Sequence, residues 1–302
     1  MQTTAHPGRN SLICSGYLKA LKMLILSFFF IFCFYISFIA TFTKTIMTPD
    51  INMYDTYDYL VNRALKRYTT DLDNNILKNN QLFIGIGGGP GSGKSTLATA
   101  VKNAINLKEN KELAVVLPMD GFHYSRLKLK QLGEKGVMIG DPSGTKCLTT
   151  TFEDLIARRG SPWTFDSSSI IKEFTKVRED GFGSLPIYSR EESDPVDDGV
   201  KLLSSHGIVL LEGNYLLCYN DPEWSPLKDI FDEKWYIQCN SMDDQRSRLI
   251  DRHLETWTEA KTKMFGAGRK GATIKADSND VLNAIWVERM SKDHADLIVH
   301  SK

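Results

Sequence analysis

The sequence lacks the features that are typical of secreted, disulfide-bonded proteins. Its cysteines show neither a Cys-x-x-Cys pair nor zinc-ligand spacing, and their odd number leaves one without a disulfide partner. No Asn-x-Ser/Thr glycosylation acceptor occurs in the 302 residues. Both absences favour a reducing compartment. The five cysteines are Cys14, Cys33, Cys147, Cys218 and Cys239.

A surplus of positive charge is also missing from most of the chain. The sequence holds 37 basic and 37 acidic residues, and residues 1–46 contain four of the basic ones and no acid. The rest therefore has 33 basic against 37 acidic side chains. A slightly acidic body is poorly suited to binding phosphate backbones, so we expect no nucleic-acid partner.

Residues 82–105 carry the strongest local pattern. The apolar stretch 82–86 is typical of a buried strand, residues 88–95 fit G-x-x-x-x-G-K-[S/T], and residues 97–105 form an alanine-rich helical pattern. This order of strand, loop and helix predicts a phosphate-binding P-loop rather than a chance Gly-rich turn. The predicted nucleotide-binding residues are Gly88, Gly89, Pro90, Gly91, Ser92, Gly93, Lys94, Ser95 and Thr96.

The residue types of this loop suit a nucleoside triphosphate. Glycines let backbone N–H groups turn toward an anion, and the start of a helix adds partial positive charge. We expect Lys94 to reach the β- and γ-phosphates and the Ser95 hydroxyl to bind Mg²⁺. The guanine motif Asn-Lys-x-Asp is absent, since residues 110–113 read Asn-Lys-Glu-Leu, which argues against a GTPase.

Two acidic residues follow predicted strands. Asp120 comes after the apolar stretch 113–117, and Glu212 ends the apolar run 208–211. Ligands of parallel α/β sheets bind at the carboxyl ends of strands, so Asp120 is predicted to take the proton of an attacking hydroxyl. The alternative for Asp120 is an Asp-Gly turn without chemistry. Glu212 is predicted to lie on the Mg²⁺ side, because a buried acid needs a metal or a basic partner.

Several polar residues near these strands allow two interpretations. His123 suits either a packed position or the site, and Arg159 either complements a helix end or binds substrate. Tyr188 and Arg190 lie in a mixed polar segment that suits a substrate pocket or a solvated loop.

Residues 242–257 read as a helix that carries four basic side chains, Arg246, Arg248, Arg252 and His253. Arginines that follow a strand of this kind are candidates for a lid that closes on phosphates. The alternative is a solvated basic face, which we favour for Arg246 and Arg248.

The remaining periodicity alternates helices with apolar strands. Residues 131–148 are rich in Gly and Lys and receive no role. Asp166 or Ser167 is predicted to cap a helix that runs to about residue 178. Further helices are predicted near 50–75, 152–160 and 278–291, and further strands at 234–239 and 295–299.

Five blocks, taken in order, resemble the phosphoribulokinase/uridine kinase/pantothenate kinase group of P-loop kinases. The likeness is greatest to yeast-type ATP-dependent kinases and to bacterial nucleoside or sugar kinase-like proteins of that group, and it covers about residues 55–300. The ordered set is specific, whereas any single block except the P-loop is weak. The blocks are the P-loop, Met119-Asp120-Gly121-Phe122-His123, Arg159-Gly160-Ser161-Pro162 through Phe165-Asp166, Leu211-Glu212-Gly213-Asn214-Tyr215 and Arg252-His253-Leu254.

The resemblance implies roles for matching residues. Lys94 and Ser95 match the P-loop lysine and the Mg²⁺ ligand, Asp120 the catalytic base, Glu212 the metal-side acid and Arg252 the lid arginine. Tyr188 falls where pantothenate kinases have a Pro-Val-Tyr-Ser segment near the substrate.

The chain also departs from both groups. Pantothenate kinases have Lys-Gly-Phe-Pro where this chain has Arg159-Gly160-Ser161-Pro162, and uridine kinases follow the Asp with Phe-Tyr. The final 50 residues match neither substrate pocket. The acceptor therefore stays open.

Residues 1–46 lie outside the resemblance. Met23–Phe42 is a 20-residue run without a charged side chain, long enough to span a bilayer. Basic residues precede it, so the positive-inside rule would export the P-loop region, away from cytosolic ATP. Either the run is an anchor that breaks this rule, or the working protein starts at Met47 and lacks it. The expected location is cytoplasmic, or membrane-anchored if residues 1–46 are retained.

Together these observations predict an α/β, three-layer P-loop NTPase fold with a mostly parallel central sheet and a mobile lid, formed by residues 47–302. The predicted function is ATP- and Mg²⁺-dependent transfer of the γ-phosphoryl group to a hydroxyl of a small pantothenate-, nucleoside- or sugar-like metabolite. One alternative is a nucleotide-binding switch that hydrolyses ATP slowly. Another is a membrane-tethered scaffold with a vestigial P-loop, which the complete set of acidic and basic site residues disfavours. Oligomeric state is not predicted.

Overall fold

The computed structural model describes residues 45–46, 53–136, 138–140, 147–189 and 191–301. Residues 45–302 form one compact unit. The predicted membrane segment Met23–Phe42 and the candidate residue Arg190 lie outside the described residues. Among the helices that the structure does describe, none combines the length and apolar character needed to cross a bilayer.

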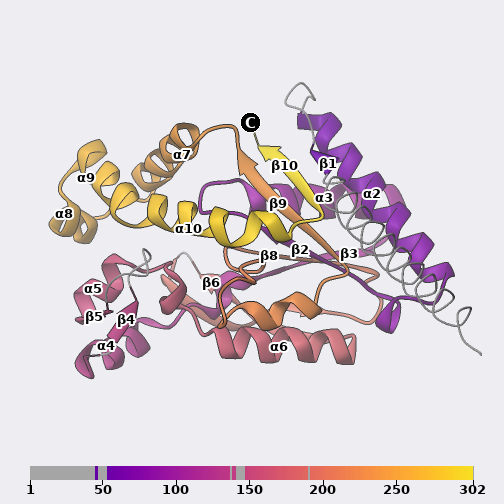
Figure 1. The fold of residues 1–302 in the computed structure, drawn as a ribbon, viewed down its shortest axis with the longest axis horizontal. Coiled ribbons are helices and arrows are strands. Elements are labelled where there is room, and N and C mark those ends of the chain that lie inside the picture. The colour runs from indigo at the N-terminus through magenta and orange to yellow at the C-terminus, as the bar shows by residue number, and fades with distance from the viewer. Residues whose placement is uncertain (1–44, 47–52, 137, 141–146, 190, 302) are drawn as a thin grey trace, which may run out of the picture. The chain divides into compact units, whose positions relative to one another are not determined.

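A parallel sheet forms the centre of this unit (Figure 1). Its strand order is β1-β10-β9-β2-β8-β3, and every neighbouring pair runs parallel. The mostly parallel α/β architecture predicted from the sequence is therefore confirmed. The strands are β1 (Thr45–Ile46), β2 (Leu82–Gly87), β3 (Ala114–Pro118), β8 (Ile208–Gly213), β9 (Glu233–Cys239) and β10 (Leu297–Ser301).

Helices cover both faces of the sheet because its inner strands are apolar on both sides. Successive residues of β2 point to opposite faces, so Phe83 and Ile84 enter different hydrophobic clusters. The helices α2 (Met53–Asp73) and α3 (Lys94–Glu109) pack on the Ile84 side. The helices α6 (Ser167–Asp180) and α10 (Val281–Ser291) pack on the Phe83 side. Figure 1 shows α2 and α6 on opposite sides of the strands.

Helix α2 lies within the stretch that helical periodicity predicted. Leu60, Val61 and Ala64 on one face are buried against the sheet. Arg63 adds a polar contact between α2 and β9, because its Nε donates to Glu233 Oε1. The same carboxylate oxygen accepts from Trp235 Nε1 at 2.6 Å. The helix therefore belongs to the folded unit.

The strand order brings the chemically interesting strand ends together. The chain leaves β2, crosses to β3 at the edge, and returns later to insert β8 between them. Glu212 on β8 is paired in register with Ile86 of β2 and Pro118 of β3. Parallel strands with this kind of switch open a crevice at their carboxyl ends. The P-loop, Asp120 and Glu212 all lie at that edge.

Two peripheral regions complete the fold. One is an antiparallel hairpin of β6 (Gly183–Ser189) and β7 (Asp194–Leu202), which the sequence did not predict as strands. The other is a helical region of α7 (Met242–Glu255), α8 (Glu259–Phe265), α9 (Gly268–Lys275) and the π-helical turn η5 (Ala276–Asp280) that leads into α10. Smaller elements are α4 (Arg126–Glu134), β4 (Met138–Gly140), β5 (Cys147–Thr149) and α5 (Phe152–Ala157).

Candidate active site

The predicted P-loop joins β2 to α3 as the motif requires. Gly91 and Gly93 have φ angles of 79° and 91°, in the left-handed region that favours glycine. Gly93 is the N-cap of α3, so the first N–H groups of this helix are free of intrahelical partners and suited to a phosphate.

Residues of α7 and α10 contact and support the P-loop. Gln245 of α7 donates from Nε2 to the Pro90 carbonyl at 2.7 Å. A Cβ atom on Gly89 would lie 2.9 Å from Ala284 of α10, so glycine is required for this close approach. The sequence did not reveal this support, because Gln245 and Ala284 belong to no recognisable motif.

Charged groups meet at the floor of the loop. The Lys94 side chain is buried, and burial lowers its pKa, while the nearby carboxylates of Glu212 and Asp120 oppose that shift. Burial likewise raises the pKa of Glu212, and the Lys94 ammonium opposes the rise. Ser95 donates from Oγ to Glu212 Oε2 at 3.0 Å. The sequence predicted that Glu212 would face the metal or a basic residue, and in the structure Lys94 is a basic group near it.

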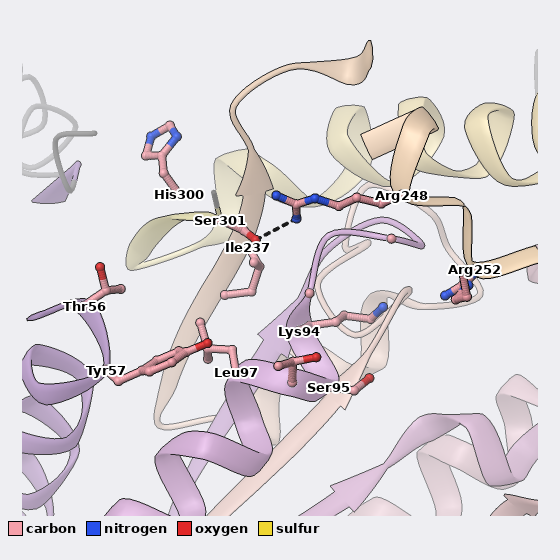
Figure 2. Close-up of a pocket in the computed structure, with 13 residues that line it drawn as sticks. Thr56, Tyr57, Lys94, Ser95, Leu97, Ile237, Arg248, Arg252, His300 and Ser301 are labelled. Atoms are coloured by element: carbon pink, nitrogen blue, oxygen red, sulfur yellow. Dashed lines mark hydrogen bonds between the residues drawn. The ribbon is translucent and has the colours of Figure 1, made fainter. Parts of the chain in front are cut away.

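A cavity of about 340 Å³ opens above this floor (Figure 2). Lys94, Ser95 and Thr96 form one wall, and Arg248 and Arg252 enter from α7. Residues of three other elements also line the cavity, namely Thr56 and Tyr57 of α2, Ile237 of β9, and His300 and Ser301 of β10.

The structure corrects the interpretation of Arg248. A solvated position was favoured for Arg246 and Arg248, and Arg246 indeed forms a half-exposed ion pair with Asp277. Arg248 instead lines the cavity and donates from Nη1 to Ser301 Oγ at 2.9 Å. Its spacing of four residues from Arg252 puts both on one helix face, and this signal could have identified it.

A second group of predicted residues lies beside Asp120. His123 contacts the Asp120 carbonyl through Nδ1 at 2.8 Å, and its ring centroid is 5.0 Å from that of Tyr188. Burial lowers the pKa of His123, which favours the neutral imidazole although the Asp120 charge opposes the shift. The Arg159 guanidinium lies 5.3 Å from the Tyr188 ring and pairs with Asp194 at 2.7 Å. The structure therefore brings His123, Tyr188 and Arg159 together.

Asn214 is a candidate that sequence reasoning missed. It follows Glu212 by two residues at the carboxyl end of β8, and its side chain is buried. Its Oδ1 atom has no hydrogen-bond partner within the described part of the chain. Buried polar atoms without partners are rare and call for an explanation such as a ligand. Its position after the strand-terminal acid was the available signal.

A phosphate-binding loop, a buried lysine and a serine–carboxylate pair at the switch point of a parallel sheet define a P-loop nucleotide-binding protein. No family model matches the sequence. A protein of Schizosaccharomyces pombe named "Putative uridine kinase C227.14" is 31% identical over 245 residues, which cover 80% of this chain and 88% of the relative.

Two solved structures are also similar. One is titled as a "putative fructose transport system kinase" from Silicibacter sp. TM1040, with a TM-score of 0.56, 27% identity and coverage of 72% of this chain and 89% of that one. The other is YFH7 of Saccharomyces cerevisiae, titled "a putative P-loop containing kinase with a circular permutation", with a TM-score of 0.61, 18% identity and coverage of 82% of this chain and 99% of that one. The latter shows the fold alone.

The chain belongs to the phosphoribulokinase/uridine kinase/pantothenate kinase group of P-loop kinases. Its general class is that of an ATP-dependent kinase.

Proposed function

We propose that this kinase transfers the γ-phosphoryl group of ATP to a hydroxyl group of a small metabolite, with Mg²⁺ as cofactor. The observation that carries the proposal is the convergence of Lys94, the Ser95–Glu212 pair and Asp120 on one edge of the sheet. P-loop phosphoryl transfer needs a cation for the phosphates, oxygen ligands for the metal, and a group that orients the nucleophile.

The donor set suits magnesium. Mg²⁺ prefers oxygen ligands and is commonly held by one or two protein groups together with substrate phosphates. Ser95 Oγ and the Glu212 carboxylate supply such oxygens beside the loop. Within the described residues no cluster of three His, Cys, Asp or Glu side chains forms a metal cage, so ATP phosphates would complete the coordination. The metal would neutralise charge on the transferred group.

Asp120, Lys94 and Arg252 would have the remaining roles in the reaction. The Asp120 carboxylate would take the proton of the acceptor hydroxyl. At the same time the hydroxyl oxygen of the acceptor would bond to the γ-phosphorus, and the bond from that phosphorus to the β,γ-bridging oxygen would break. Lys94 and Arg252 would stabilise the negative charge that leaves with ADP and spreads over the transferred group. Both line the same cavity, which supports this assignment.

The acceptor would bind on the Asp120 side, near His123 and Tyr188. A neutral imidazole and a phenol hydroxyl are hydrogen-bonding groups suited to a polyhydroxylated or amide-bearing molecule. Relatives carry the names uridine kinase and pantothenate kinase, so nucleoside-, pantothenate- and sugar-like acceptors are proposed. Arg159 is already paired with Asp194, so its role would be to shape this pocket.

A phosphoryl-transfer screen tests the proposal. Pantothenate, uridine, glycerate and hexoses are each incubated with [γ-³²P]ATP, Mg²⁺ and the full-length chain, with the Lys94→Ala protein as the matched control. Label is expected in one acceptor with the native protein only. Slow release of phosphate without any labelled acceptor, while ATP binds, would favour the nucleotide switch instead.

A further inference from the structure

The π-helical turn Ala276–Asp280 touches two separate parts of the site. Such turns are rare, arise where one residue is added to a helix, and occur frequently at functional positions. Consecutive residues in a helix point about 100° apart, so adjacent side chains of this turn can bind different elements. Asn279 and Asp280 do so here.

On the nucleotide side, Asp280 binds the helix that carries the cavity arginines. Its Oδ2 lies 2.7 Å from Nε2 of His253, and each of the two side chains is only 12% exposed. His253 directly follows Arg252 in α7. Burial opposes ionisation of Asp280, but the bond to His253 and the charges of Lys275 and Arg252 outweigh it and lower the pKa.

A second acid of the same turn reinforces this contact. Asp277 receives two hydrogen bonds from Arg246 of α7, the longer at 2.8 Å. Asp277 and Asp280 are three residues apart and bind residues two helical turns apart on α7. The turn and α7 are therefore held together at two points.

On the acceptor side, Asn279 binds the loop Arg158–Ser161. The Asn279 side chain is fully buried, its Oδ1 accepts from Arg158 Nε at 3.1 Å and Ser161 Oγ at 3.0 Å, and its Nδ2 donates to the Arg159 carbonyl at 2.9 Å. Lys275 adds a bond from Nζ to the Ala157 carbonyl at 2.8 Å. Breaking such buried bonds leaves unpaired polar groups at a cost that favours motion as a unit.

The loop leads directly to the proposed acceptor pocket. Arg159 donates to Asp194 and to the Tyr124 carbonyl, and its guanidinium faces the Tyr188 ring. A displacement of α7 would thus reach the pocket through hydrogen bonds that are joined by the chain at Asn279–Asp280 and along the loop.

We propose that Asn279 and Asp280 are positioning residues that couple nucleotide binding at Arg252 to the arrangement of the acceptor loop Arg158–Ser161. The inference rests on the proposed function in taking the His123–Tyr188 side as the acceptor side. The turn contributes no residue to the lining of the nucleotide cavity, so its proposed role is to transmit a change from one side of the site to the other.

Hydrogen exchange on the full-length protein tests the coupling without knowledge of the acceptor. The probe is the non-hydrolysable ATP analogue AMP-PNP with Mg²⁺, and its affinity is measured in parallel by calorimetry. In the native protein, AMP-PNP is expected to slow amide exchange in peptides covering 157–161 by roughly threefold, because the loop becomes ordered with α7.

Two variants each remove the contacts on one side of the turn. Asn279→Ala removes the loop contacts, and the double variant Arg246→Ala/His253→Ala removes both contacts of the turn with α7. Ser278→Ala, an exposed neighbour, is the matched control. Both variants that remove contacts should bind AMP-PNP with native affinity yet lose the exchange response at 157–161. A merely structural role would raise exchange with and without nucleotide and leave the response intact.

The outcomes are distinct. Native-like responses in Asn279→Ala or Arg246→Ala/His253→Ala, or no response in a native protein that binds AMP-PNP, would overturn the coupling and leave the kinase assignment standing. If Asn279→Ala does not fold, Arg246→Ala/His253→Ala decides. Failure of the native protein to bind AMP-PNP at all would overturn the proposed function and the coupling together.

Discussion

At the residue scale, the site is built from charges that share a buried space. Lys94 and Glu212 each shift toward the neutral form through burial, and each opposes the shift of the other. A buried pair of this kind gains little stability, because desolvation offsets the attraction. Bound phosphates and a metal would supply the missing counter-charges.

The substitution Asp120→Asn tests the proposed general base separately from the groups that bind ATP. The substitution removes a proton acceptor but leaves Lys94 and the loop N–H groups in place. Loss of a general base costs about 10²–10⁴-fold in rate, so transfer should collapse while ATP affinity changes little. The measurements are the transfer rate with the screened acceptor and ATP affinity by calorimetry. Transfer at the native rate would show that the base is another group.

Glu212→Gln should change the magnesium requirement. The amide keeps the shape but binds Mg²⁺ more weakly than a carboxylate, so the Mg²⁺ concentration for half-maximal activity should rise several-fold. A magnesium titration at fixed ATP measures it. An unchanged midpoint would place the metal elsewhere.

The same residue predicts a pH effect. Burial raises the pKa of Glu212, so protons compete with Mg²⁺ at a higher pH than for an ordinary glutamate. In the native protein the Mg²⁺ midpoint should rise as the pH falls toward the raised pKa of Glu212, and in Glu212→Gln it should depend less on pH. Parallel titrations of both proteins at each pH test this, and identical slopes would refute it.

At the element scale, α6 is tied to the start of β2 by one carboxylate. Asp232 accepts two hydrogen bonds from Arg178 and one from the Phe83 N–H at 2.7 Å. The two side chains are 15% and 19% exposed, so the pair is largely shielded from water.

Asp232→Ala should therefore lower the free energy of unfolding by about 3 kcal/mol, because it leaves a mostly buried guanidinium unpaired. Glu179→Ala is the matched control, since Glu179 pairs with Lys78 at 3.8 Å on the exposed surface. The control should change stability by less than about 1 kcal/mol. Urea unfolding of both variants gives the comparison, and equal effects would contradict the argument.

The sequence predicted some elements well and others not at all, for physical reasons. The strands β2, β3 and β8 are largely buried and read as nearly continuous apolar runs, and β9 has an apolar centre of three buried residues. The hairpin β6–β7 was missed because its strands are mostly half-exposed and rich in polar residues, and only pairing reveals them. Arg248 was misjudged because its four-residue spacing from Arg252, which puts both arginines on one face of α7, was not used.

At the scale of the whole molecule, we predict that residues 1–46 are dispensable for catalysis. Of the described sheet, the truncation removes only the two-residue edge strand β1. The contacts of α2 with the sheet come from residues after Met47, including Arg63 and Leu60. A truncated protein that begins at Met47 should be soluble and as active as the full chain. Activity assays of both proteins, with and without detergent, provide the test. Aggregation of the truncated protein, with activity only from the full chain in detergent, would indicate a true anchor.

The position of β2 has a consequence for how the protein is made. Its two neighbours, β8 and β9, begin only at Ile208 and Glu233, and β10 follows at Leu297. During synthesis the P-loop is translated early but gains its flanking strands late. Contacts this distant in sequence form slowly. We therefore expect the nascent chain to bind ATP only after β9 has been synthesised, and ATP, by binding the folded state, would favour completion of folding.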